Sequence, residues 1–136
     1  MSKNSRILMF ASAAGFLPQP GFALYAATKA FVLSYSRALN VELKPRNIVV
    51  TAVCPGPVAT EFFETAETCG QMPSYKRQFM AKPKSVVRKA LRDSMMGKEI
   101  SVYGMAMKGF RVLCKAVPHR LILAWMERRG GGHEER

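Results

Sequence analysis

Cysteine is scarce in this sequence, and the three cysteines present argue against two kinds of site. Cys54, Cys69 and Cys114 are odd in number, lie far apart and form no CxxC pair. A disulfide framework requires an even set, and a structural zinc site requires closely spaced ligands. His119 and His133 have no partner set for metal or triad chemistry. We therefore expect no metal site, and this cysteine usage fits a reducing, cytoplasmic compartment best.

Acidic residues are also scarce, since nine Asp and Glu face 21 Lys and Arg and give a net charge of +12. Residues 1–75 carry six basic and four acidic side chains, whereas residues 76–136 carry fifteen and five. A basic surface of this kind could meet nucleic acid, anionic lipid or a phosphorylated ligand. Aromatic residues do not interleave with the basic ones as they do in base-stacking modules, so a nucleic-acid partner is disfavoured.

A clean hydrophobic run of membrane-spanning length is missing as well. The stretch from Ile7 to Thr28 is uncharged, but its middle reads "GFLPQPGF", a turn that lipid would not tolerate. Lys3 and Arg6 before the apolar stretch resemble the start of a signal peptide, although a buried strand explains the run equally well.

What is present indicates one alternating α/β domain. The 136 residues are 49% hydrophobic, enough for one modest core. Runs of β-branched residues predict buried strands, and apolar spacings of three and four predict helices. We expect, in order, a strand at 7–12, a helix at 22–44, a strand at 48–54, a short helix near Glu61–Thr68, a helix at 83–97, a strand at 99–104, helices at 105–117 and 118–129, and a disordered tail at 130–136.

A strand, a long helix and a second strand form a right-handed βαβ unit, so the sheet should be small and mostly parallel. Ligands bind outside the carboxyl ends of the strands in such sheets. Ser12 ends the first strand, and "CPGPVAT" ends the second. Tyr25 and Lys29 lie one helical turn apart, where an ammonium group favours the phenolate needed for proton transfer. On spacing alone, two side chains that extend from a helix face explain this pair more simply.

The segments "ILMFASAAG", "YAATKAF" and "NIVVTAVCPGPVAT" together resemble the C-terminal half of a short-chain dehydrogenase/reductase, over about residues 5–103. The resemblance implies a partial Rossmann-like, doubly wound fold. It also implies NAD or NADP as cofactor and the interconversion of a ketone and a secondary alcohol. Tyr25 would be the general acid and base, Lys29 would bind the nicotinamide ribose, and Ser12 would orient the substrate carbonyl.

The same resemblance implies further contacts. Residues beside the nicotinamide would be Tyr25, Lys29, Pro55, Gly56, Val58 and Thr60. Residues beside the substrate would be Ser12, Ala14 and Gly15. The hydrophobic C-terminal helices suggest an apolar or acyl substrate.

One family feature is absent, namely the glycine-rich turn that holds the cofactor's pyrophosphate. The glycines before residue 97 show no GxxxGxG spacing: Gly15, Gly21, Gly56 and Gly70. We therefore expect residues 1–104 to be the C-terminal half of the Rossmann-like domain, beginning at about the fifth strand of seven, without the N-terminal cofactor-binding half. Residues 105–129 would form basic amphipathic helices, followed by the tail.

A sheet without its other half should leave an edge and apolar side chains exposed. We expect this of Phe10, Phe31, Val32 and Tyr35, and from it a homo-oligomer or a complementing chain. The alternative to an enzyme is a non-catalytic interaction or membrane-surface module. In that case Phe110, Leu121, Ile122 and Trp125 would enter the bilayer, and Lys108, Arg111 and Lys115 would share one basic face. A solvated basic face over packed helices is the simpler explanation.

Overall fold

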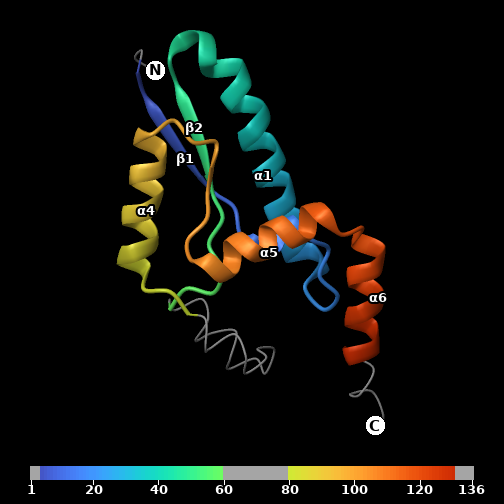
Figure 1. Ribbon diagram of the computed structural model, residues 1–136. Helices are drawn as coiled ribbons and strands as arrows, with labels where there is room; N and C mark the ends of the chain where they lie inside the picture. Colours follow the sequence, from blue (N-terminus) through green and yellow to red (C-terminus); the bar gives the residue numbers. More distant parts are fainter. Residues whose placement is uncertain (1–3, 60–79, 131–136) are drawn as a thin grey trace.

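The computed structural model describes residues 4–59 and 80–130, which form a three-stranded parallel sheet with helices on both faces (Figure 1). The strands are β1 (Arg6–Phe10), β2 (Val49–Val53) and β3 (Ile100–Ser101), in the order β1-β2-β3. Arg6 pairs with Val49 at the start of β1, and Val53 pairs with Ser101 of β3. The expected small parallel sheet is confirmed.

The central strand β2 is buried on both faces, as its β-branched sequence predicts. Ala52 and Cys54 belong to a core cluster against which Val32 and Leu33 of α1 (Ala23–Leu43) pack. Val53 lies in a second cluster with side chains of α4 (Pro83–Met95). Figure 1 shows α1 and α4 on opposite sides of the strands. This is the layered arrangement of a doubly wound fold.

The ends of α1 follow from local sequence. Gly21, at φ +79°, adopts the left-handed conformation that closes the "LPQPG" turn before the helix. After Leu43 a short 3₁₀ turn, η2 (Lys44–Arg46), contains Pro45, and Asn47 follows at φ 54°. Asparagine tolerates this left-handed conformation better than most residues, so the chain can reverse into β2 there.

Two C-terminal helices complete the described structure, α5 (Met105–Ala116) and α6 (His119–Gly130). Helix α5 lies beside the carboxyl ends of the strands (Figure 1), where Phe110 packs against Phe16 with ring centroids 6.5 Å apart. The sequence places Ala106, Leu113 and Val117 on the apolar side of this helix together with Phe110. Phe110 and Val117 are half-buried, but Ala106 and Leu113 are exposed. Met107, Arg111 and Cys114 are covered as well.

Most predicted boundaries lie within two residues of the observed ones, and two predictions need correction. The third strand has only two residues rather than the span 99–104, and Gly130 belongs to α6 rather than to the tail. Phe10, Phe31 and Tyr35 are exposed as expected, but Val32 packs against the core. The expected helix near Glu61–Thr68 lies outside the described residues, as does the tail from residue 131.

None of the helices in the described ranges is long and apolar enough to cross a bilayer. Phe110 and Ile122, expected at a membrane surface, are half-buried, whereas Leu121 and Trp125 are exposed.

Candidate functional site

The loops after β1 and β2 are joined at the carboxyl edge of the sheet. Ser12 lies two residues beyond β1 and caps a 3₁₀ turn, η1 (Ala13–Phe16), because its Oγ accepts a hydrogen bond of 3.1 Å from the Ala14 N–H. The Ala13 N–H donates to the Pro55 carbonyl over 2.9 Å. The segment that carries Ser12 is therefore held against the Pro55-Gly56 segment.

The side chains of Tyr25 and Lys29 meet at the same edge. Lys29 Nζ lies 5.7 Å from the centre of the Tyr25 ring, and both residues are half-buried. The same Nζ donates a 3.1 Å hydrogen bond to the carbonyl of Phe10, the last residue of β1. An ammonium group can donate three hydrogen bonds. Among the described residues, the Lys29 ammonium donates one, to Phe10. The amine is thus fixed at the end of β1 with capacity for a further acceptor.

Gly15 explains how η1 can lie so close to α1. A Cβ atom at this position would lie 2.9 Å from the backbone carbon and oxygen of Lys29, and 3.0 Å from the Ala30 nitrogen. These backbone atoms cannot move aside without shifting the helix. The absence of a side chain at Gly15 therefore lets the Ser12 loop pack directly on the turn of α1 that carries Lys29.

Gly56 is covered by a side chain that the sequence did not single out. A Cβ atom there would lie 2.5 Å from the sulfur of Met107 and 2.7 Å from its Cγ, so α5 packs directly over the Pro-Gly segment. Only the abundance of methionine after residue 71 hinted at an adaptable apolar contact of this kind. Val58 forms a bridge with Ala81, and Thr60 lies outside the described residues.

Of the predicted residues, the structure thus brings Ser12, Pro55 and Lys29 to one rim. The Ser12 loop, Pro55, Lys29 and the end of β1 are linked by the hydrogen bonds above. For the Ser12 hydroxyl, the described partner is the backbone of its own turn. Its role as the group that orients a carbonyl stays a prediction.

An apolar groove of about 570 Å³ lies nearby, between η1, α1 and α6. Gly15 and the α1 residues Ala23, Ala26 and Ala30 help to line it, whereas Tyr25 and Lys29 are not part of its lining. The groove therefore does not open onto the phenol, and it gives no support for the expected apolar or acyl substrate.

Cys54, next to Pro55, is fully buried. Burial raises the pKa of its thiol to about 12, although the positive charge of Arg111 opposes the shift. A thiol of this kind stays protonated and unreactive at neutral pH.

Known proteins resemble the chain both in sequence and in fold. A family model described as short chain dehydrogenase matches residues 1–69. The chain is 40% identical over 62 residues to a 3-oxoacyl-(acyl-carrier-protein) reductase of Synechocystis sp., covering 46% of this chain and 25% of that protein. It is 38% identical over 85 residues to a very-long-chain 3-oxoacyl-CoA reductase of Anas platyrhynchos, covering 62% of this chain and 25% of the relative.

Among solved structures, a short-chain dehydrogenase from Sphingobium yanoikuyae in complex with NADPH matches with a TM-score of 0.62 and 28% identity, over 96% of this chain and 46% of that one. A short chain dehydrogenase from Burkholderia cenocepacia in complex with NADP matches with a TM-score of 0.70 and 21% identity, over 88% and 47% of the two chains. This chain thus spans about a quarter of the length of the two curated relatives and under half of these solved chains.

The family model covers half of the chain, and its span contains the rim residues Ser12, Tyr25, Lys29 and Pro55. The parallel sheet with helices on both faces matches part of the fold of these enzymes. The chain therefore belongs to the short chain dehydrogenase family.

Proposed function

We propose that this chain carries the proton-transfer part of an NAD(P)-dependent oxidoreductase that interconverts a ketone and a secondary alcohol. One observation carries the proposal: Lys29, one helical turn from Tyr25, is fixed to the end of β1 beside the loop of Ser12. The proposal thus rests on a phenol, an amine and a hydroxyl-bearing loop near the edge where α/β folds bind their ligands.

Each side chain has a definite task in the proposed reaction. In reduction the Tyr25 hydroxyl gives its proton to the substrate carbonyl oxygen, and in oxidation the phenolate takes the proton back from the alcohol. The Ser12 hydroxyl donates a hydrogen bond that orients the same oxygen. The Lys29 ammonium donates hydrogen bonds to the hydroxyls of the cofactor's ribose. The nicotinamide, when bound, supplies or accepts the hydride.

The residues present fit one end of this cofactor and not the other. Lys29 has donor capacity for a ribose, and Pro55 lies at the same rim, but Met107 covers Gly56, so a nicotinamide there would have to share or displace that contact. For the pyrophosphate, the 136 residues hold no glycine-rich turn that opens a helix. The proposal therefore assigns no residue of this chain to the cofactor's phosphates.

A binding experiment tests the proposal directly. The purified chain is titrated with NADPH and with NADH while nicotinamide fluorescence is followed. We expect saturable binding that weakens at least tenfold in Lys29→Ala, because a charge-assisted hydrogen bond contributes about 1.5–3 kcal/mol. Lys44→Ala removes the same charge from the exposed start of η2, just after α1, and should bind like the wild type. Equal binding by the two variants would refute the role of Lys29.

Turnover separates the hydroxyl of Tyr25 from cofactor binding. Because two relatives are named as 3-oxoacyl reductases, a 3-oxoacyl thioester is a reasonable test substrate for the proposed apolar or acyl specificity. Tyr25→Phe should retain cofactor binding and lose turnover. Absence of saturable binding to either nucleotide would exclude catalysis by this chain acting by itself.

In that case the second candidate, a non-catalytic interaction module, gains support. The observation in its favour is the exposed aromatic pair on α1, where Phe31 and Tyr35 stack with ring centroids 6.0 Å apart and are 69% and 48% exposed. Such a surface is typical of a contact with another protein chain.

A further inference from the structure

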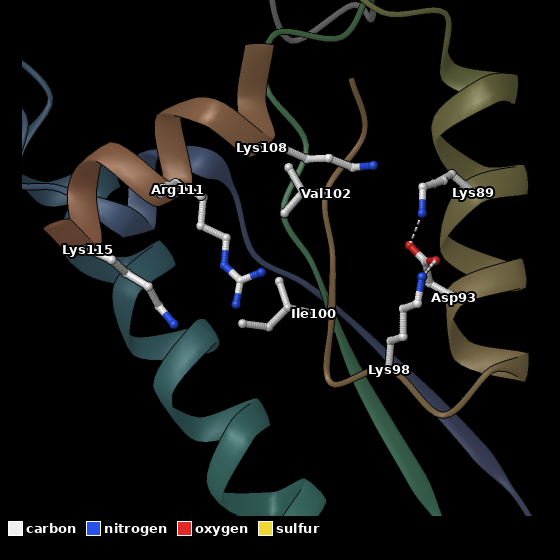
Figure 2. Close-up of a pocket in the computed structure, with 9 residues that line it drawn as sticks. Lys89, Asp93, Lys98, Ile100, Val102, Lys108, Arg111 and Lys115 are labelled. Carbon is white, nitrogen blue, oxygen red and sulfur yellow. Dashed lines mark hydrogen bonds and ion pairs between the residues drawn. The ribbon is translucent and has the colours of Figure 1, made fainter. Parts of the chain in front are cut away.

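A second cleft, of about 390 Å³, lies between α4, β3 and α5. Its lining includes none of Ser12, Tyr25 and Lys29. Figure 2 shows Lys108 and Arg111 extending from α5 toward β3, Lys115 one turn further along α5, and Asp93 with Lys89 and Lys98 on the far side. The charged lining residues are Lys89, Asp93, Lys98, Lys108, Arg111 and Lys115.

On the α4 side, Asp93 is a buried hub whose charge is already matched. Its side chain is 2% exposed and accepts hydrogen bonds from Lys89 (2.5 Å), Lys98 (3.0 Å) and Ser101 (2.8 Å). Burial by itself would raise the pKa of this carboxyl, but these hydrogen bonds outweigh it and lower the pKa to about 2. Asp93 is therefore ionised at neutral pH, and its single charge is shared between two lysines.

On the α5 side, the three cations have no such partner among the residues that the structure describes. Lys108, Arg111 and Lys115 recur at spacings of three and four and share one face of the helix, as the sequence predicts. Among the ion pairs of residues 4–59 and 80–128, none joins any of the three to a carboxylate. Five cations and one anion thus line the cleft, and its net charge is +4.

This charge distribution makes the cleft attractive to an anion. Like charges along the walls of a cleft reinforce one another, and the field is focused where the walls have a low dielectric constant. Arg111 is half-buried, so its guanidinium is less screened than a fully solvated one. The fork of an arginine matches the oxygens of a phosphate, and neighbouring lysines add point charges. A volume near 400 Å³ is within the usual range of small-ligand sites.

Lysines beside an exposed edge strand also have a simpler explanation. They can discourage another strand from pairing with β3, which is an edge of the described sheet. That explanation requires only solvated charge. It does not require a half-buried arginine, nor the apolar wall formed by Ile100, Val102 and Val112. It also predicts no saturable binding.

We propose that this cleft is a binding site for a phosphate monoester, held by Lys108, Arg111 and Lys115. The apolar wall would contact the group that carries the phosphate. The ester could be a soluble phosphorylated compound or the head group of phosphatidic acid, and the chemistry recognised is the same in both cases.

Calorimetric titration of the full chain with phenyl phosphate and with inorganic phosphate, at 150 mM NaCl, tests the site. We expect saturable binding of both, tighter for phenyl phosphate because of the apolar wall. Lys108→Gln/Lys115→Gln should weaken binding at least tenfold. The matched control, Lys84→Gln/Arg88→Gln, removes two exposed charges from α4 outside the cleft and should change binding less than twofold.

Vesicles distinguish the two sources of phosphate. Phosphatidylcholine vesicles with one fifth phosphatidic acid are sedimented with the chain, with and without phenyl phosphate as competitor. Vesicle binding that requires Lys108 and Lys115, and that phenyl phosphate inhibits, identifies a lipid head group as the ligand. Binding of phenyl phosphate without vesicle binding identifies a soluble ligand. If neither phosphate probe saturates, or if both double variants lose binding equally, the charges are only a solvated edge and the proposal is wrong.

Discussion

Individual residues at the rim hold its segments together by close contacts, in addition to their proposed roles in proton transfer. Lys29 donates to the end of β1, and Gly15 lets the loop of Ser12 rest on the backbone of the same helical turn. The spacing of Tyr25 and Lys29 by itself would be weak support for a reactive site, because two amphipathic side chains on a helix face show the same spacing. The contact through Gly15 joins the serine and the lysine segments into one unit.

The Gly15 contact can be tested by stability. In Gly15→Ala the new methyl group would meet backbone atoms of Lys29 at 2.9 Å, so η1 or α1 must shift. We expect the free energy of unfolding, measured in urea, to fall by about 1–3 kcal/mol. Gly109→Ala is the control: it lies inside α5 with no atom within 4 Å of the new methyl group, so helix propensity should raise stability by up to about 1 kcal/mol. A Gly15→Ala variant as stable as the wild type would contradict the contact.

At the scale of elements, sequence patterns predict those structural features that depend on residues close together in the chain. Three features could be predicted from the sequence because each depends on a single helix or strand. They are the helical period of α1, the β-branched run of β2 and the spacing of the cations in α5. The buried face of α5 could not be predicted in this way, because the orientation of the helix depends on contacts with Gly56 and Phe16, which are distant in the chain.

The basic cleft could not be predicted from the sequence for the same reason, because it forms only where α4 and α5 face each other across β3. The Lys89–Asp93 spacing is visible in the sequence, but pairs of this kind are usually exposed, whereas Asp93 is buried.

Asp93 links three elements, because it lies on α4 and binds Lys98 in the following loop and Ser101 of β3. Its pKa falls from 3.8 to about 2 on folding, so its contribution to stability is complete above pH 4 and is lost as the pH falls through 2. We expect the wild type to lose about 2 kcal/mol more unfolding free energy than Asp93→Asn between pH 5 and pH 2.

The matched control for this acid limb is Glu99→Gln. Glu99 pairs with Arg37 at 3.5 Å, and the side chains of Arg37 and Glu99 are 51% and 42% exposed, so the pair should contribute little. The wild type and the control should therefore show parallel acid limbs. If the acid limb of Asp93→Asn is parallel to those of the wild type and the control, the charge of Asp93 does not stabilise the fold.

At the scale of the whole molecule, exposed apolar side chains occur on α1, α4, α5 and α6, and those of α1 include a stacked aromatic pair. The basic side chains gather in the cleft of α4 and α5, while α1 carries exposed Leu24, Phe31 and Tyr35. β1 is an edge of the sheet in the described part of the chain. An apolar helix face near an open edge favours association with another chain.

We therefore expect the chain to self-associate through α1, and light scattering across a range of concentrations measures this. Phe31→Lys/Tyr35→Lys replaces an exposed stacked pair and should shift the mass toward the monomer without a large loss of stability. Val87→Lys/Leu91→Lys is the matched control, since it changes two apolar side chains of similar exposure on α4 and should leave the mass distribution unchanged. A wild-type chain that is monomeric at every concentration would show that the α1 face does not pair two copies, and a complementing chain of different sequence would then be the partner to seek.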